Sequence, residues 1–253
     1  MMTLFKRKKK DRKKSWLREL IWTIVIVVAA RAFLLEPFTI PSGSMMPNLL
    51  IGDYLFVNKW RYGWCKHSFV FSLPLLPGRV FGSAPVAGDT VVFRLPSDLN
   101  VHYVKRLIGV PGDRVQVKDG IVFLNGKPLK QKEVESYNIR SAVGYDKPAR
   151  AFIEELPNGK SYKILRADYG KDTRANNTEE FVVPEGHYFF LGDNRDNSAD
   201  SRFSLGFVSE ELIVGTPFLV FLSVNESILD LLKVSEWSKN VRLERFFSFV
   251  GDI

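Results

Sequence analysis

The chain of 253 residues has a net charge of +8, but that charge is concentrated at one end. Nine of the 36 Lys/Arg residues and one of the 28 Asp/Glu residues fall in residues 1–18, so the rest of the chain carries 27 of each and is neutral. A neutral body offers no basic face to nucleic acid, so we expect no nucleic-acid partner. One cysteine and three scattered histidines give neither an intramolecular disulfide nor a metal-ligand spacing, so we expect no metal and no cofactor.

The N-terminal segment combines a basic run, residues 6–14, with an apolar stretch that extends to residue 35. One interpretation is a single transmembrane helix, which over residues 17–35 is about 28 Å long. The other is a cleaved signal peptide with Ala30-Arg31-Ala32 as a small-x-small site. Because arginine is awkward inside a cleavage site and apolar residues follow it, we favour the uncleaved anchor.

The lysines that precede this anchor predict its orientation. By the positive-inside rule, residues 1–14 lie in the cytoplasm and everything after residue 36 lies on the other side of the membrane. The anchor ends at Glu36 because Pro37 disfavours helical backbone angles at the residue before it.

The body after the anchor reads as mostly β. Short β-branched and aromatic runs separated by turn signals predict strands at residues 53–57, 90–95, 101–108, 114–118, 121–124, 181–183, 188–191 and 217–224. The dipeptides Asp119-Gly120 and Asn125-Gly126 are hairpin signatures, so we expect antiparallel pairing.

The same pattern divides the chain into segments. We expect a basic tail at 1–14, an anchor at 15–36, a β core at 37–126 and 181–224, a polar insertion at 127–180 and C-terminal surface helices at 225–253. The insertion reads as short strands outside the main core. Residues 60–88 are aromatic and rich in Pro and Gly, and two readings stay open: a long loop on the core, or a lip that dips into a membrane interface.

Residues 40–47, IPSGSMMP, place the hydroxyls of Ser42 and Ser44 between prolines that fix φ and a glycine that allows a sharp turn. Such a segment is an ordinary turn or a platform for a nucleophile. A serine hydroxyl is a poor nucleophile at neutral pH, so the second reading needs a base within hydrogen-bond reach.

Lys105 is the candidate base. In a strand over residues 101–108 the period of two puts Tyr103, Lys105 and Leu107 on one face, where burial disfavours the charged amine and lowers its pKa. A neutral amine can accept the serine proton. Taken alone, Lys105 also fits a solvated strand lysine, and the neighbouring Arg106 shows how ordinary such charges are in a strand.

A third polar stretch, residues 192–202 with sequence GDNRDNSADSR, resembles a calcium loop only superficially. Counted from Asp193, the third, sixth and twelfth positions are Arg195, Ser198 and Ser204, where a calcium loop needs an oxygen ligand, glycine and glutamate. We therefore expect a loop held by internal Asp/Arg pairs that presents Ser198 to Lys105.

Three motifs together resemble those of bacterial signal peptidase I, the leader peptidase family. They are PSGSMMP at 41–47, YVKR at 103–106 with GVPGD at 109–113, and GDNRDNS at 192–198 with DSR at 200–202. The resemblance covers roughly residues 16–222 and departs from the family pattern at Asn48, where threonine is frequent. It implies an antiparallel β-sheet catalytic domain of the signal peptidase/LexA-like fold behind an N-terminal transmembrane helix.

The resemblance also implies roles for individual residues. Ser44 is the nucleophile and Lys105 the general base, and the Ser42 hydroxyl with the Ser44 N–H forms the oxyanion hole. The lysine-orienting and site-supporting residues are Ser198, Asp200 and Arg202.

The implied substrate is the signal peptide of an exported preprotein, with small residues at −1 and −3, bound as an added strand. Phe38, Met45, Leu49 and Val104 line its shallow pockets. The implied enzyme is a serine endopeptidase at the outer face of the bacterial cytoplasmic membrane, embedded in the lipid bilayer by one span.

Two rival functions fit parts of this pattern. A self-cleaving Ser–Lys repressor of related fold would be soluble and carry a DNA-binding module, which the apolar N-terminal helix and neutral body disfavour. A membrane-tethered module that only binds extended peptides would keep the sheet edge and the apolar pockets but would tolerate loss of Ser44.

Overall fold

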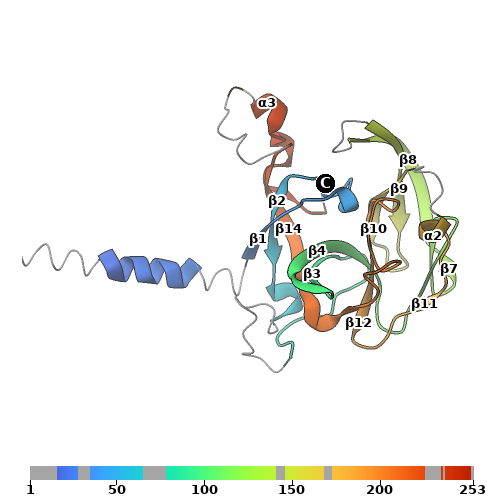
Figure 1. The fold of residues 1–253 in the computed structure, drawn as a ribbon, viewed down its shortest axis with the longest axis horizontal. Coiled ribbons are helices and arrows are strands. Elements are labelled where there is room, and N and C mark those ends of the chain that lie inside the picture. The colour runs from blue at the N-terminus through green and yellow to red at the C-terminus, as the bar shows by residue number, and fades with distance from the viewer. Residues whose placement is uncertain are drawn as a thin grey trace, which may run out of the picture.

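Strands dominate the computed structural model, which describes residues 16–27, 35–64, 78–140, 146–167, 173–225, 235 and 237–251 (Figure 1). The largest sheet runs in the order β1 (Leu35–Thr39), β2 (Asp53–Asn58), β14 (Ile213–Ser223), β3 (Thr90–Leu95), β4 (Asp98–Gly109), β12 (His187–Leu191) and β13 (Val208–Ser209), with β15 (Ser248–Phe249) also pairing β14. Every named strand pair is antiparallel. The expected mostly β, antiparallel fold is confirmed.

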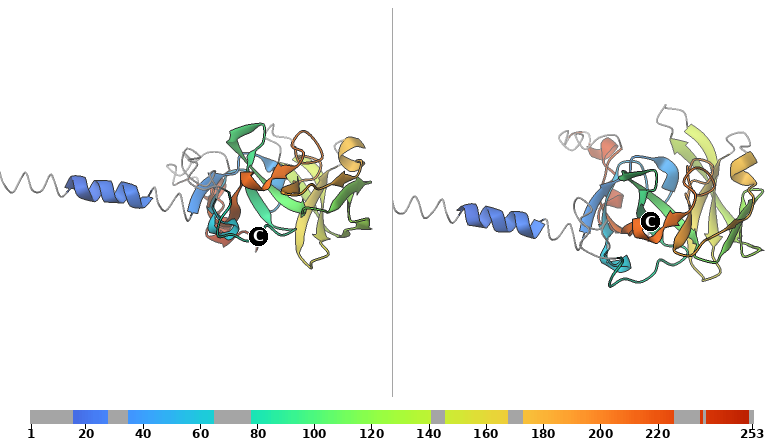
Figure 2. Two further views of the ribbon diagram at one scale, coloured as in Figure 1. Left: turned by 90° about the horizontal axis from the view of Figure 1, so that it is seen from below. Right: turned by 60° about the horizontal axis from the view of Figure 1, so that its bottom comes forward.

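Two smaller sheets complete the body. One has the order β10 (Ser161–Ala167), β9 (Asp146–Glu155) and β8 (Lys130–Arg140); the other has the order β11 (Phe181–Val182), β5 (Arg114–Lys118), β6 (Ile121–Leu124) and β7 (Lys127–Pro128). The views in Figures 1 and 2 place the β8–β10 sheet on the side of the body away from β1.

The described helices are few and short. They are α2 (Thr173–Asn176), α3 (Trp237–Asn240) and the 3₁₀ turns η1 (Gly43–Met45), η2 (Trp60–Tyr62), η5 (Glu210–Leu212) and η8 (Leu243–Arg245), besides helical residues 16–27. The helical turns therefore serve as connections between strands.

Turn chemistry sets the register of the hairpins. At both predicted hairpins the two central residues have positive φ, 48° and 74° at Asp119-Gly120 and 53° and 77° at Asn125-Gly126. This conformation matches the right-handed twist of the flanking strands and favours Asx-Gly pairs. The two hairpins join β5 to β6 and β6 to β7, as the sequence predicts.

The expected anchor and the structure differ at their junction. Leu35 and Glu36 pair with Asn58 and Val57 in the sheet, and the Glu36 carboxylate lies 2.7 Å from Lys59 Nζ, so the last two residues of the predicted anchor belong to the sheet. Residues 1–15 and 28–34, which include the alternative cleavage site, lie outside the described residues. Within the described ranges, no helix is both long and apolar enough to cross a membrane.

The insertion also differs from the expectation, because it shares the main core. Phe152 of β9 and Ile164 of β10 belong to one buried cluster with Ile108 of β4 and Phe189 of β12. The polar composition of residues 127–180 reflects strand faces turned to solvent, while alternate residues turn inward. These strands are also longer than short insertion strands, at 11 and 10 residues for β8 and β9.

The described part of the C-terminal segment contains the short helix α3 and the 3₁₀ turn η8, and it is tied to β2. Arg245, which is buried, donates to both carboxylate oxygens of Asp53 at 3.1 and 2.7 Å, and Ser223 Oγ donates to the same carboxylate at 2.6 Å. Residues 226–234 of this segment lie outside the described residues.

Residues 60–88 are described only at their ends. Tyr62 is buried in the core, Trp60 and Phe81 are exposed, and residues 65–77 lie outside the described ranges. Both readings of this segment, core loop and membrane lip, stay predictions.

The aromatic core beneath β3 and β12 generates a stability prediction. Phe190 is fully buried and stacks on Phe93 with ring centroids 4.6 Å apart. Phe190→Ala leaves a cavity in a close-packed interior, so it should lower the free energy of unfolding by about 3–5 kcal/mol. The exposed Phe249 is the matched control, and Phe249→Ala should change it by about 0.5 kcal/mol or less. Equal denaturation midpoints for the two variants would contradict this core assignment.

Candidate active site

Ser44 and Lys105 meet in the folded chain. Ser44 lies in the 3₁₀ turn η1, Lys105 lies in β4, and Lys105 Nζ is 2.6 Å from Ser44 Oγ. Nζ also donates to the carbonyl oxygen of Val104 at 3.2 Å. A hydroxyl and an amine at this distance can exchange a proton directly.

The setting of Lys105 favours its neutral form. The side chain is 4% exposed, and Nζ lies 5.0 Å from the centre of the Tyr103 ring, which confirms that these two residues share a strand face. Burial lowers the pKa of Lys105 to about 8, although the negative charges of Asp200 and Asp193 oppose the shift. The amine can therefore lose its proton near neutral pH, as a general base must.

Ser42 lies beside the pair. Its hydroxyl oxygen is 3.5 Å from Ser44 Oγ, at the outer limit of a hydrogen bond, and Ser42 is exposed while Ser44 is buried. A second hydroxyl next to a nucleophile can donate to an oxygen atom that develops negative charge there.

The loop of residues 192–202 holds η1 in place through hydrogen bonds to its backbone. The Asn194 N–H donates to Ser44 O and the Asn194 side-chain amide donates to Gly43 O, both at 3.0 Å. Gly192 permits this contact, because a Cβ added there would lie 2.6 Å from Ser44 O and 2.2 Å from Ser198 Oγ. The loop can approach the nucleophile this closely only with glycine at position 192.

Asp200 and Arg202 form the internal pair that the sequence predicts. The Arg202 guanidinium donates to the two carboxylate oxygens of Asp200 at 2.9 and 2.8 Å, and Asp200 also accepts the Gly192 N–H at 3.1 Å. Arg202 further donates to Arg195 O at 2.6 Å and to Ala175 O at 3.0 Å. The Asp200–Arg202 pair therefore connects the end of the loop to its beginning, at Gly192 and Arg195.

The structure does not join Ser198 to Lys105. The Ser198 Oγ atom is buried and has no hydrogen-bond partner among the described residues. It borders the same space beside Gly192 as the Ser44 carbonyl oxygen. The predicted orienting contact is thus absent from the described part of the chain, although the hydroxyl is free to make one.

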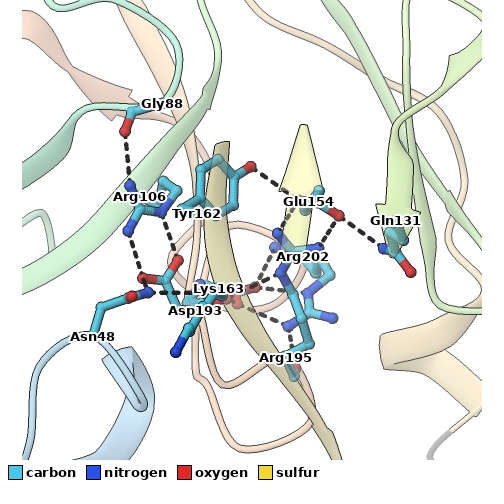
Figure 3. A network of polar contacts seen from close by, with 12 residues as sticks. Asn48, Gly88, Arg106, Gln131, Glu154, Tyr162, Lys163, Asp193, Arg195 and Arg202 are labelled. Carbon is cyan, nitrogen blue, oxygen red and sulfur yellow. Dashed lines mark hydrogen bonds and ion pairs between the residues drawn. The ribbon is translucent and has the colours of Figure 1, made fainter. Parts of the chain in front are cut away.

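Arg106 is not the ordinary strand charge that its position suggests. It is buried on the opposite face of β4 from Lys105, and its guanidinium donates to the two oxygens of Asp193 at 2.6 and 2.7 Å (Figure 3). The Asn48 side-chain amide donates to the same carboxylate at 2.6 Å and to the Lys163 carbonyl oxygen at 2.8 Å. The departure at Asn48 from the usual family pattern is therefore built into this network.

A cleft of about 380 Å³ opens onto the dyad between β1 and β4. Three of the predicted substrate-binding residues line it, namely Phe38, Met45 and Val104. Leu49 lines no part of it, because it is fully buried in a cluster that includes Met45. A larger cavity of about 500 Å³ is lined by Arg106 rather than by either member of the dyad.

Sequence reasoning overlooked His102, which lines the cleft and contacts Phe38 edge-on, with ring centroids 5.1 Å apart. Burial lowers the pKa of His102, and the Arg94 charge adds to the effect. The sequence analysis also assigned no individual role to Gly192, Asp193 or Asn194. They stand in a motif that the sequence marked as unusual, but only the fold shows what each one touches.

The described residues hold no cluster of His, Cys, Asp or Glu that could bind a metal ion. A serine paired with a buried amine is a site for acyl transfer that works without one.

Comparison with known proteins agrees with this chemistry. A family model described as signal peptidase, peptidase S26, matches residues 13–222. The chain is 41% identical over 254 residues to a signal peptidase I from Rickettsia felis, covering 94% of this chain and 93% of that protein. It is 42% identical over 240 residues to a signal peptidase I from Rickettsia typhi, covering 89% of each.

A crystal structure of a signal peptidase I from Enterococcus faecalis aligns at 28% identity with 53% of this chain and 97% of that chain, with a TM-score of 0.32. The class of protein is therefore settled by sequence: the chain is a serine endopeptidase. More particularly, it belongs to the signal peptidase I family, peptidase S26.

The close approach at Gly192 generates a prediction. Gly192→Ala places a methyl group against the Ser44 carbonyl oxygen, so the loop or η1 must move and the endopeptidase rate constant should fall by about 10²-fold. Gly78→Ala is the matched control, because a Cβ there meets no atom of the described residues within 4 Å, and it should leave the rate unchanged. Single-turnover cleavage by folded protein checks this. Full activity in Gly192→Ala would show that the loop tolerates displacement.

Proposed function

We propose that this chain removes signal peptides from exported preproteins, with Ser44 as nucleophile and Lys105 as general base. One observation carries the assignment of roles: a buried lysine amine lies 2.6 Å from a serine hydroxyl. Burying an amine costs stability, so the burial of Lys105 is not explained by stability. It is explained by a role in which the neutral amine takes a proton.

Catalysis begins with proton transfer from the Ser44 hydroxyl to the neutral amine of Lys105. Ser44 Oγ attacks the carbonyl carbon of the substrate residue at −1, and the carbonyl oxygen becomes an oxyanion. The Ser42 hydroxyl and the Ser44 N–H donate to that oxygen, a contribution worth about 3–4 kcal/mol of barrier for each donor in comparable sites.

Collapse of this intermediate breaks the peptide bond. The Lys105 ammonium returns its proton to the leaving nitrogen, which departs as the new N-terminus of the mature protein. The signal peptide stays on Ser44 as an ester. Lys105, neutral again, takes a proton from water, and the hydroxide attacks the ester. The Lys105 ammonium then returns that proton to Ser44 Oγ as the ester bond breaks, and the signal peptide leaves as a carboxylic acid.

The substrate binds as a strand between two unpaired edges. In the described residues β1 pairs only with β2, and β12 pairs with β4 only from Arg106 to Gly109. The first half of β4 and the outer edge of β1 therefore offer free backbone groups on the two sides of the cleft, the arrangement that receives an added strand.

The size of the cleft accounts for small residues at −1 and −3. Phe38, Met45 and Val104 leave shallow apolar pockets, and Leu49 supports Met45 from behind. Alternate residues of an extended substrate face the same side, so −1 and −3 enter the pockets together.

Ser198, Asp200 and Arg202 support the dyad. The buried Ser198 hydroxyl, which lacks a partner in the described residues, turns toward Lys105 when substrate binds and orients the amine. The Asp200–Arg202 pair keeps Gly192 and its neighbours against η1.

The N-terminal helix anchors the enzyme in the bacterial cytoplasmic membrane. Nine large apolar side chains of residues 16–27 are exposed in the structure, as expected of a helix that faces lipid. With the basic tail of residues 1–14 in the cytoplasm, the catalytic body lies at the periplasmic face, where exported preproteins emerge.

Side-by-side cleavage assays test this function. Wild type in detergent should cut a preprotein at its Ala-x-Ala site, whereas Ser44→Ala and Lys105→Ala should each lose about 10⁴-fold or more in rate, because a dyad acts as a unit. Phe249→Ala, an exposed change in β15 outside the cleft, is the matched control and should cleave at the wild-type rate. Absence of cleavage by folded wild type would favour the peptide-binding module instead.

The pKa of Lys105 predicts how the rate depends on pH. Only the neutral amine is active, and with a pKa of about 8 it is about one tenth neutral at pH 7 and about nine tenths neutral at pH 9. The value of kcat/KM should therefore rise about tenfold over this interval and then level off. Lys105→Arg should be inactive throughout, since its guanidinium stays protonated. A rise centred below the ordinary pKa of histidine would point to His102 as the base.

A further inference from the structure

A buried ion pair fastens the loop of residues 192–202 to the β8–β10 sheet. The Arg195 guanidinium donates through Nη1 to Glu154 Oε2 at 2.9 Å and through Nη2 to Glu154 Oε1 (Figure 3). The side chains are 4% and 0% exposed. Glu154 belongs to β9 in the insertion, so the pair joins two segments that are 41 residues apart in the sequence.

Glu154 is held by all three strands of that sheet. Besides Arg195, its carboxylate accepts the Tyr162 hydroxyl of β10 at 2.9 Å and the Gln131 amide of β8 at 2.8 Å. Burial alone would raise the pKa of Glu154, but the Arg195 charge and these hydrogen bonds outweigh it and hold the pKa below its usual value. Glu154 is therefore a fixed negative charge at neutral pH.

A buried ion pair of this kind is not explained by stability. An apolar pair of similar volume is often as stable or more so, whereas loss of one partner leaves a costly unpaired charge. The pair therefore acts as a geometric constraint.

Arg195 passes that constraint to the dyad. Its Nε donates to Gly192 O at 3.2 Å, its backbone N–H donates to Leu165 O at 3.0 Å, and Leu165 N–H donates to Asp193 O at 2.8 Å. The residue between Asp193 and Arg195 is Asn194, which holds Ser44 O and Gly43 O. A continuous chain of contacts thus runs from Glu154 through Arg195 and Asn194 to the nucleophile.

We propose that Glu154 is a positioning residue for the Ser44–Lys105 dyad, which makes the inserted β8–β10 sheet part of the catalytic apparatus. This inference rests on the proposed function. Glu154 does not contact the dyad; it fixes Arg195, and Arg195 fixes the loop of residues 192–202. That loop holds η1 through Asn194, and its residues Asn197 and Ala199 line the cleft together with Lys105.

Glu154→Gln removes the charge and keeps the shape. The Arg195 cation then has a neutral partner in a dry site and moves toward water, which loosens residues 192–195. Two consequences follow. The serine loses its alignment, so kcat should fall by about 10²-fold while KM changes less, since β1 and β4 line the cleft. Water also reaches Lys105, so the rise of kcat with pH should move upward by about one unit.

The control variants come from the same sheet. Glu133→Gln removes a carboxylate of β8 that faces Arg150 at 3.9 Å on the exposed surface, and it should leave kcat and the pH profile unchanged. Glu154→Asp keeps the charge with a shorter reach and should recover part of the lost kcat. Gln131→Ala removes one hydrogen bond to Glu154 and provides a milder version of the same effect if Glu154→Gln folds poorly.

The experiment measures kcat and KM for preprotein cleavage from pH 6 to 10 with each full-length variant, corrected for the folded fraction. A lower kcat with an upward-shifted pH profile in Glu154→Gln, and in smaller degree in Gln131→Ala, supports the inference. A lower folded fraction with an unshifted profile, or an effect equal to that of Glu133→Gln, overturns it. If wild-type cleavage does not depend on Lys105, the proposed function itself fails.

Discussion

The burial of one lysine amine is the constraint on which the rest of the structure depends. A Ser–Lys dyad works only if the amine is neutral, and in this chain only desolvation lowers its pKa, since Asp200 and Asp193 act in the opposite direction. The fold must therefore exclude water from Lys105 while keeping two carboxylates nearby. It does so by satisfying each carboxylate elsewhere, Asp193 by Arg106 and Asn48, and Asp200 by Arg202 and the Gly192 N–H.

This arrangement explains why so much buried charge surrounds a small site. Alternate residues of β4 serve opposite faces: Lys105 faces the cleft, and Arg106 faces the network that holds the loop. The loop in turn packs against η1 through Asn194 and is tied to the β8–β10 sheet through Arg195. Three segments far apart in the chain therefore share one requirement, which is that the nucleophile and the amine stay 2.6 Å apart in a dry environment.

The sequence predicts the local features well, because strand composition and Asx-Gly turns are local signals. It gave β3, β5 and β6 with their observed bounds and placed both hairpins. The dyad could be proposed from motif and strand period. The insertion, however, was expected outside the core, because its apolar residues are spread at alternate positions and reveal their partners Ile108 and Phe189 only on folding. The importance of Arg106, Gly192 and Glu154 lies in contacts across large sequence separations, which no local pattern encodes.

The proposed mechanism depends most directly on the protonation state of Lys105 in the folded protein. Its Nζ can be followed by nitrogen NMR in protein labelled at lysine, with Lys105→Met to assign the signal. This mechanism predicts that the amine titrates near pH 8, below the ordinary value for lysine, and that the shift disappears when the protein is unfolded. Titration of Lys105 near pH 10.5 in folded, active enzyme would contradict it, because the amine would then be charged at working pH and could not take the serine proton.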